Sequence, residues 1–434
     1  MNDRHHPDRW STRARIAAGV RRLGTSGTVL LMAAAVLVPA ALGGSSAQAA
    51  AAPGLQYNDT LSAVSCPAVG TCMAVGTNTS ADSVQSPVAE EWHDGSWQVF
   101  TVPGLLDLFG VSCASATYCV AVGGSDGQAA SELWNGQTWQ PLTTQNAGGP
   151  ASLLYSVDCL SATDCMAVGY GWPNDDQENT LVERWNGHDW RLLRTPPHSY
   201  EVEQSLNAVS CLGTTWCMAV GEAFGPQRPR PLAVQWNGTR WLKVATPRTG
   251  SSLSGLSCTS PANCIAVGGY TNAAGRQMKT LGEQWNGTSW QVLTTMNPGS
   301  GNSLSSVSCP TAANCVAVGS GLAEQWNGST WQALPAPSAG LVSVSCPAAS
   351  SCLAVGGKSS RPDHLTLAES WNGTAWQDVS SPSPPEVNGY WILTANGGVA
   401  NFDAPWYGSD RGHLSGRAIG IITDTATGGY WILN

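Results

Sequence analysis

The fold is decided by a repeated unit, of which one compact copy, residues 304–334, reads LSSVSCPTAANCVAVGSGLAEQWNGSTWQAL. Four short runs of alternating or apolar residues stand out in it: LSSVSC, CVAVG, LAEQW and WQAL. The pair Asn327-Gly328 separates the third run from the fourth and is a strong hairpin signal, because both residues tolerate positive φ. The unit therefore predicts four antiparallel strands.

This unit recurs seven times, and each copy has a Cys-x5-Cys pair, a glycine four residues after the second cysteine, and two tryptophans five positions apart. Seven such sheets set radially bury each sheet against its neighbours. The sequence predicts an all-β, seven-bladed β-propeller over residues 55–381, with a linear solenoid as the alternative. The cysteine pairs are Cys66 and Cys72, Cys113 and Cys119, Cys159 and Cys165, Cys211 and Cys217, Cys258 and Cys264, Cys309 and Cys315, and Cys346 and Cys352.

The unit resembles a kelch repeat in the order of its parts. These are a strand, a strand that ends in glycine, a variable loop, a third strand, a tight turn, a tryptophan and an exit that contains proline (WQALPAP, residues 331–337). Residues 92–97, WHDGSW, are similar to part of the Asp-box of sialidase-type propellers. The units look most like uncharacterised Cys-rich, Trp-Asn-Gly repeats of secreted proteins from high-GC Gram-positive bacteria. This resemblance implies a propeller. The units differ from kelch repeats in two respects: they contain cysteine pairs, and they have tryptophan where kelch usually has tyrosine. No kelch activity is therefore carried over to this chain.

The N-terminal region predicts export. Residues 1–27 contain six arginines, an apolar run covers residues 28–42, and Ala47-Gln48-Ala49 offers a cleavage site, so residues 1–49 are interpreted as a signal peptide. The apolar run is shorter than the roughly 20 residues of a spanning helix, which makes a retained anchor the weaker alternative. Export follows the general secretory route or, given Arg21-Arg22, the twin-arginine route. We expect a bacterial protein that is secreted or associated with the cell envelope.

Signal removal takes away six of the 20 basic and two of the 29 acidic residues, which leaves a net charge of −13. An acidic protein is repelled by phosphate backbones and anionic lipids, so nucleic-acid partners and membrane insertion after cleavage are not expected.

The C-terminal region differs from the repeats. Residues 380–388 are rich in serine and proline and predict a linker. In residues 389–434 the segment GYWIL occurs at 389–393 and again at 429–433, and this tail resembles repeats appended to secreted cell-wall-associated proteins. We interpret it as a short β-rich repeat that forms an extra blade, a dimerisation strand or the remnant of a truncated array. The oligomeric state is not predicted.

The repeated residues have structural interpretations. Export to an oxidising compartment predicts one local disulfide in each blade, worth roughly 2 kcal/mol each, and thiolate metal binding is the alternative. No metal site and no cofactor are expected. The tryptophan pairs predict packing between blades, with carbohydrate stacking as the alternative. A glutamate lies two residues before the first tryptophan in six units and is replaced by Val234 in the fourth. It predicts a repeated strand-to-strand hydrogen bond or a turn contact.

The variable connections indicate where a ligand binds. The five-residue loops are constant, whereas the stretch from the glycine to the first tryptophan contains between 6 and 16 residues. Alternate connections of a meander emerge at opposite ends, so one end of the ring is uniform and the other carries all the variable loops. Aromatic and charged residues in the third, fourth and fifth units are the candidate ligand-binding residues at that end. They are Tyr170, Trp172, Phe224, Tyr270, Asp175, Asp176, Glu222 and Arg276.

Three functions fit these residues. The first is a secreted, non-catalytic propeller that binds a glycan or an extracellular protein through its variable loops. The second is an extracellular glycoside hydrolase or lyase that uses loop carboxylates, although no spacing among Asp175, Asp176, Glu178 and Glu222 selects a pair. The third is an envelope scaffold protein. No catalytic residue is assigned.

Overall fold

The structure is a computed structural model that describes most of the repeat region and short parts of the tail. Residues 1–49 and 380–388, for which we predict a signal peptide and a linker, lie outside the described residues, so these predictions stay predictions. The described residues contain no helix long and apolar enough to cross a membrane. They are residues 58–79, 85–103, 107–146, 151–172, 179–196, 203–224, 229–249, 251–271, 277–296, 301–319, 321–335, 337–338, 340–358, 365–379, 390–393, 399–402, 420–423 and 430–433.

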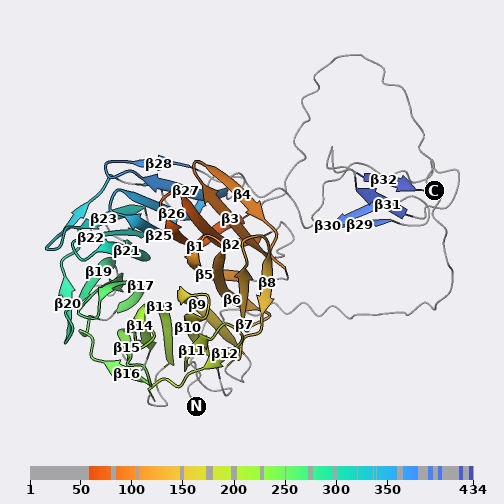
Figure 1. The fold of residues 1–434 in the computed structure, drawn as a ribbon. Coiled ribbons are helices and arrows are strands. Elements are labelled where there is room, and N and C mark those ends of the chain that lie inside the picture. Colours follow the sequence, from red (N-terminus) through yellow and green to blue (C-terminus); the bar gives the residue numbers. More distant parts are fainter. Residues whose placement is uncertain are drawn as a thin grey trace, which may run out of the picture. The chain divides into compact units, whose positions relative to one another are not determined.

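The repeats form seven four-stranded antiparallel sheets, each made of four consecutive strands, and this confirms the predicted seven-bladed propeller. The first strand of each blade lies nearest the centre of the ring and the fourth lies at the periphery (Figure 1). Blades 1 to 3 contain β1 (Asn58–Ala68), β2 (Thr71–Thr79), β3 (Gln85–His93), β4 (Ser96–Phe100); β5 (Asp107–Ser115), β6 (Tyr118–Ser125), β7 (Gln128–Trp134), β8 (Trp139–Leu142); β9 (Ser152–Ser161), β10 (Asp164–Gly171), β11 (Asn179–Trp185) and β12 (Trp190–Leu192). Blades 4 and 5 contain β13 (Glu203–Gly213), β14 (Trp216–Phe224), β15 (Arg230–Trp236), β16 (Trp241–Val244); β17 (Ser251–Ser260), β18 (Asn263–Thr271), β19 (Met278–Trp285) and β20 (Trp290–Leu293). Blades 6 and 7 contain β21 (Ser306–Thr311), β22 (Asn314–Gly319), β23 (Leu322–Trp326), β24 (Trp331–Ala333); β25 (Leu341–Ala348), β26 (Ser351–Lys358), β27 (Leu365–Trp371) and β28 (Trp376–Asp378).

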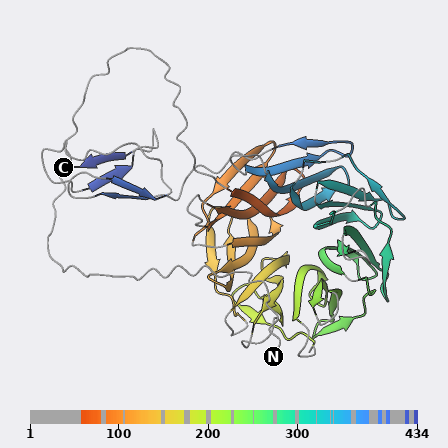
Figure 2. The same ribbon diagram turned by 180° about the vertical axis from the view of Figure 1, so that it is seen from behind.

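The ring closes directly between blade 1 and blade 7, as the view from behind also shows (Figure 2). Leu61 and Val64 of blade 1 share one buried apolar cluster with Leu353 and Val355 of blade 7. Across the same junction the Trp97 indole N–H donates to the carbonyl oxygen of Val379 at 2.6 Å. This closure excludes the solenoid alternative.

The tail supplies none of these 28 strands. Its described residues form two separate antiparallel pairs, β29 (Tyr390–Leu393) with β30 (Val399–Phe402), and β31 (Gly420–Thr423) with β32 (Tyr430–Leu433). The interpretation of the tail as an eighth blade is therefore wrong, because the seven sheets already close the ring. Each copy of the repeated YWIL segment forms a strand, β29 and β32.

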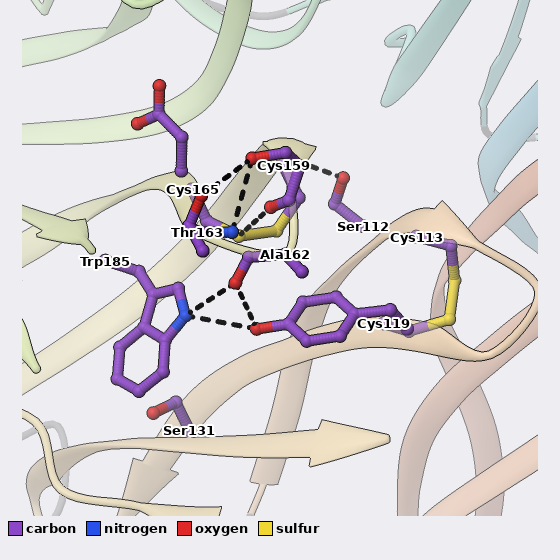
Figure 3. The surroundings of a disulfide bond; sticks show 12 residues. Ser112, Cys113, Cys119, Ser131, Cys159, Ala162, Thr163, Cys165 and Trp185 are labelled. Carbon is purple, nitrogen blue, oxygen red and sulfur yellow. Dashed lines mark hydrogen bonds between the residues drawn. A yellow bond between two sulfur atoms is a disulfide. The ribbon is translucent and has the colours of Figure 1, made fainter. Parts of the chain in front are cut away.

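Seven disulfides, one in each blade, join the predicted cysteine pairs. This confirms the predicted local disulfides and excludes the alternative that these cysteines bind a metal as thiolates. The same hairpins also connect neighbouring blades. The residue before each first cysteine, serine in six blades and Asp158 in blade 3, accepts a hydrogen bond from the N–H of the next blade's first cysteine; Figure 3 shows this contact for Cys159 and Ser112. The donor–acceptor pairs are Cys66–Ser345 (3.0 Å), Cys113–Ser65 (3.0 Å), Cys159–Ser112 (2.9 Å), Cys211–Asp158 (2.6 Å), Cys258–Ser210 (3.2 Å), Cys309–Ser257 (3.1 Å) and Cys346–Ser308 (3.0 Å).

The tryptophan pairs lie in the interfaces between blades. Trp134 and Trp139 of blade 2 pack on Met73 and Val75 of blade 1, and equivalent clusters fill the other junctions. Within each pair the ring centroids are 5.3–5.9 Å apart. In blades 2 to 6 both rings are at most 5% exposed. These indoles are therefore part of the core.

The six repeated glutamates are also buried, at 0–4% exposure. Three of them accept hydrogen bonds from the backbone that leaves the preceding blade: Glu183 from Gln145 N–H at 3.1 Å, Glu324 from Met296 N–H at 3.2 Å, and Glu369 from Ser338 N–H at 3.0 Å. Gln145 and Met296 are each the sixth residue after their blade's second tryptophan. At these three junctions the glutamate therefore joins one blade to the next.

At the same sixth position blades 1, 4 and 6 have Pro103, Pro247 and Pro337, which have no N–H to donate. In blade 6 the seventh residue, Ser338, donates to Glu369 instead, whereas among the described residues neither carboxylate oxygen of Glu283, nor Oε2 of Glu132, has a hydrogen-bond partner. Burial raises the pKa of Glu132 to about 7 and that of Glu283 to about 8. For Glu183 and Glu324, burial also raises the pKa, and the backbone hydrogen bonds oppose that shift. Blade 3 has Pro196 at this position, and the residue that faces it in blade 4 is Val234 instead of glutamate.

Candidate functional site

The two ends of the ring are built differently. In blade 3, Cys165 pairs with Trp185 and Trp185 pairs with Trp190, so the disulfide hairpin and the turn between the tryptophans lie at the same end. The connections between the second and third strands and between successive blades lie at the opposite end. We call these the disulfide end and the variable-loop end.

A β-bulge interrupts the innermost strand of six blades near the variable-loop end. In blade 3, Gly169 pairs with Leu154 and Val168 pairs with Ser156, so Tyr155 is the extra residue. Gly169 lies so close to the bulged strand that an added Cβ would collide with the Leu153 carbonyl oxygen, which explains the repeated glycine of this position. The extra residues, each four positions before the first cysteine, are Ser62, Phe109, Tyr155, Asn207, Ser254 and Val342.

Three of these bulge residues line a surface depression of about 440 Å³ that spans blades 2 to 4. Phe109 comes from β5, Tyr155 from β9 and Asn207 from β13, so the wall crosses three neighbouring inner strands. Blade 4 supplies the remaining described lining, which consists of Ser205 from β13 with Glu222 and Phe224 from β14. The depression combines three aromatic rings with three polar side chains.

The aromatic rings meet at angles. Phe109 and Tyr155 have centroids 5.8 Å apart and an interplanar angle of 61°, an edge-to-face contact. Tyr155 also contacts Tyr170 of β10, at 5.6 Å and 39°. The three rings form one cluster across blades 2 and 3. Phe224, on the blade 4 side of the depression, is 37% exposed.

Glu222 is the acidic residue among the described lining residues. It is half-buried, and burial raises the pKa of its carboxyl group. No hydrogen bond or ion pair joins it to another described residue. It pairs in register with Ser205, and Phe224 pairs with Glu203, so these four side chains lie on the same face of blade 4.

The predicted ligand-binding residues have five different placements. Glu222 and Phe224 line the depression, and Tyr170 contacts its wall through Tyr155. Trp172 is exposed after the end of β10, at 38%. Tyr270 is partly buried and packs on the apolar cluster between blades 4 and 5, so it is not among the lining residues. Asp175, Asp176 and Arg276 lie outside the described residues.

Phe109, Tyr155, Ser205 and Asn207 are not among the predicted ligand-binding residues, because they belong to the first strands of their blades and not to the variable loops. A signal was present. At the fourth position before the first cysteine, blades 1, 5 and 6 have serine, whereas blades 2 and 3 have Phe109 and Tyr155. Among the described residues, His, Cys, Asp and Glu form no group of three that would hold a metal ion.

No known protein-family model matches the chain, and no curated protein is significantly similar to it in sequence. Solved structures with similar folds include the GH74 xyloglucanase from Xanthomonas campestris, at 14% identity and TM-score 0.51, with 76% of this chain and 56% of that chain covered. They also include YCF48 bound to a D1 peptide (13%, 0.48, 68% and 90%) and a PL25 ulvan lyase (11%, 0.48, 72% and 92%). At such identities the likeness shows a propeller fold alone.

Proposed function

We propose that the chain is a secreted, non-catalytic β-propeller that binds a glycan or an extracellular protein at its variable-loop end. The observation that supports this is the depression across blades 2 to 4, where Phe109, Tyr155 and Phe224 stand beside Ser205, Asn207 and Glu222. Concave sites with apolar walls and a few convergent polar groups are the usual form of ligand sites. The depression also lies where the otherwise regular repeats differ from one another.

The enzyme hypothesis has less support. Glycoside cleavage commonly uses two carboxyl groups, roughly 5 to 10 Å apart, one of which has a raised pKa. Glu222 fits the second property, because burial raises its pKa, but the described lining contains no second carboxylate. The other loop candidates, Asp175, Asp176 and Glu178, lie outside the described residues.

The proposal is tested by screening the purified secreted chain on a glycan array and on a peptide-library array. Phe224→Ala removes an exposed ring from the depression, and we expect it to weaken the strongest binding about tenfold or more. Leu160→Ala and Leu212→Ala are matched controls, because these side chains are 39% and 37% exposed at the disulfide end. They should change binding less than about twofold.

Absence of binding on both arrays would contradict the proposal and favour the envelope scaffold. So would an equal loss of binding in the two leucine variants, because binding would then not depend on the variable-loop end.

A further inference from the structure

This inference rests on the proposed function and concerns the chemistry of the ligand. Glu222 has no hydrogen-bonded or ionic partner among the described residues, although it is half-buried beside Phe224 in the depression. A carboxylate that loses part of its hydration without a partner is destabilised. A ligand that supplies a cation to Glu222 would therefore gain more free energy than a neutral ligand of the same shape.

The charges around the depression favour a cation. Glu203 pairs with Phe224, so the carboxylates of Glu203 and Glu222 both lie on the face of blade 4 that carries Phe224. The basic residue at the start of β15, Arg230, pairs with Ala223. Because successive side chains of a strand alternate between faces, Arg230 projects from the opposite face of the blade. The chain as a whole has a net charge of −9.

The ring geometry separates a cation from a sugar. A pyranose stacks on one flat, exposed aromatic face, whereas a cation held in an aromatic cage contacts several rings set at angles. Phe109 and Tyr155 are inclined at 61°, and Tyr155 and Tyr170 at 39°. This angled cluster suits the apolar stem and cationic head of a basic side chain.

We propose that the depression binds a lysine or arginine side chain of a partner protein, with the charged head at Glu222 and the stem against Phe109, Tyr155 and Phe224. The Asn207 side-chain N–H donates to the Leu253 carbonyl oxygen at 2.9 Å, which leaves its Oδ1 to accept a hydrogen bond from the backbone of the segment that carries this basic side chain. The partner is an extracellular protein with an exposed basic segment.

The test uses a peptide array in which the central residue of random peptides is fixed as lysine, N-ε-acetyl-lysine, arginine, citrulline, leucine or glutamate. Acetyl-lysine and citrulline keep the length of the stem and remove the charge. The secreted chain should bind the lysine and arginine pools at least about tenfold better than their neutral counterparts. The preference should weaken with added salt.

Glu222→Gln should abolish this preference, with a melting temperature close to that of the wild type as the check on folding. Asp189→Asn removes one negative charge from an exposed turn at the disulfide end and should leave the preference unchanged. Equal binding of charged and neutral pools, or a preference that survives Glu222→Gln, would overturn the inference.

The outcomes also separate the inference from the proposed function. Glycan binding that is lost in Phe224→Ala, without any preference for basic peptides, would keep the function and overturn the inference. Binding to neither array would overturn both.

Discussion

At the disulfide end, every blade presents the same Cys-x5-Cys hairpin and passes a hydrogen bond to the next blade, whereas at the variable-loop end the stretch from glycine to tryptophan varies from 6 to 16 residues. The same seven sheets build both ends. The difference teaches that features shared by all repeats maintain the ring, and that positions where one or two blades deviate are candidates for binding. Phe109, Tyr155 and Glu222 are such deviations.

The largest expected effect concerns the glycine that supports the variable-loop end. Gly169→Ala should destabilise the protein by about 3 kcal/mol, because the new Cβ would collide with backbone atoms of Leu153 and Leu154 that no side-chain rotation can move. It should also weaken ligand binding by displacing Tyr155. Urea unfolding and the array assay measure the two effects.

The control lies at the disulfide end. A methyl group added at Gly213 would meet open space, so Gly213→Ala should change stability by no more than about 0.5 kcal/mol. Equal stability of the two variants would show that the bulge does not require glycine.

Much of this fold could be predicted because the repeat supplies redundant information. Seven equal cysteine spacings, seven glycines and six Asn-Gly turns predict the blades, the disulfides and the uniform end. The bulge could not be predicted. It depends on a close approach of β9 and β10 at Gly169, which is a property of backbone packing and leaves no mark in the alternation of apolar residues.

The second prediction removes the disulfide of one blade at the disulfide end. Replacing Cys211 and Cys217 by alanine should cost about 2 kcal/mol, because the unfolded chain regains the freedom of the small loop that the disulfide closes. Array binding should stay within about twofold of wild type, since the depression lies at the other end. Chemical unfolding and the array assay test this. A comparable loss of binding would show that the two ends are not independent.

The candidate site was only half predictable for a related reason. Phe224 and Glu222 follow the repeated glycine of blade 4 and stand out in the sequence as loop residues. Phe109 and Tyr155 belong to the first strands of their blades, where the sequence singled out no candidate, and both are the extra residues of β-bulges. Tyr270 is the converse case, because this aromatic residue near a loop is partly buried against the apolar cluster between blades 4 and 5.

A third prediction uses the glutamates to compare blade junctions. The pKa of Glu132 is raised to about 7 and that of Glu283 to about 8, so the folded chain retains protons that the unfolded chain releases near pH 4.5. Their contribution to stability is complete below that pH and is lost as the pH rises through 7 and 8. The melting temperature should fall from pH 5 to pH 8, on the order of 5 °C, and Glu283→Gln should reduce this fall.

The smallest effect, and the most selective, concerns Pro247. Pro247→Ala restores an N–H at the position where Gln145 and Met296 donate to Glu183 and Glu324, so the pKa of Glu283 should fall and the pH dependence should flatten. Removing the proline also costs about 0.5–1 kcal/mol at every pH, because the unfolded chain gains freedom. Pro196→Ala is the matched control: it carries the same entropic cost but faces Val234, so its pH dependence should equal that of the wild type. Identical pH profiles for the two variants would mean that the missing N–H does not set the pKa of Glu283.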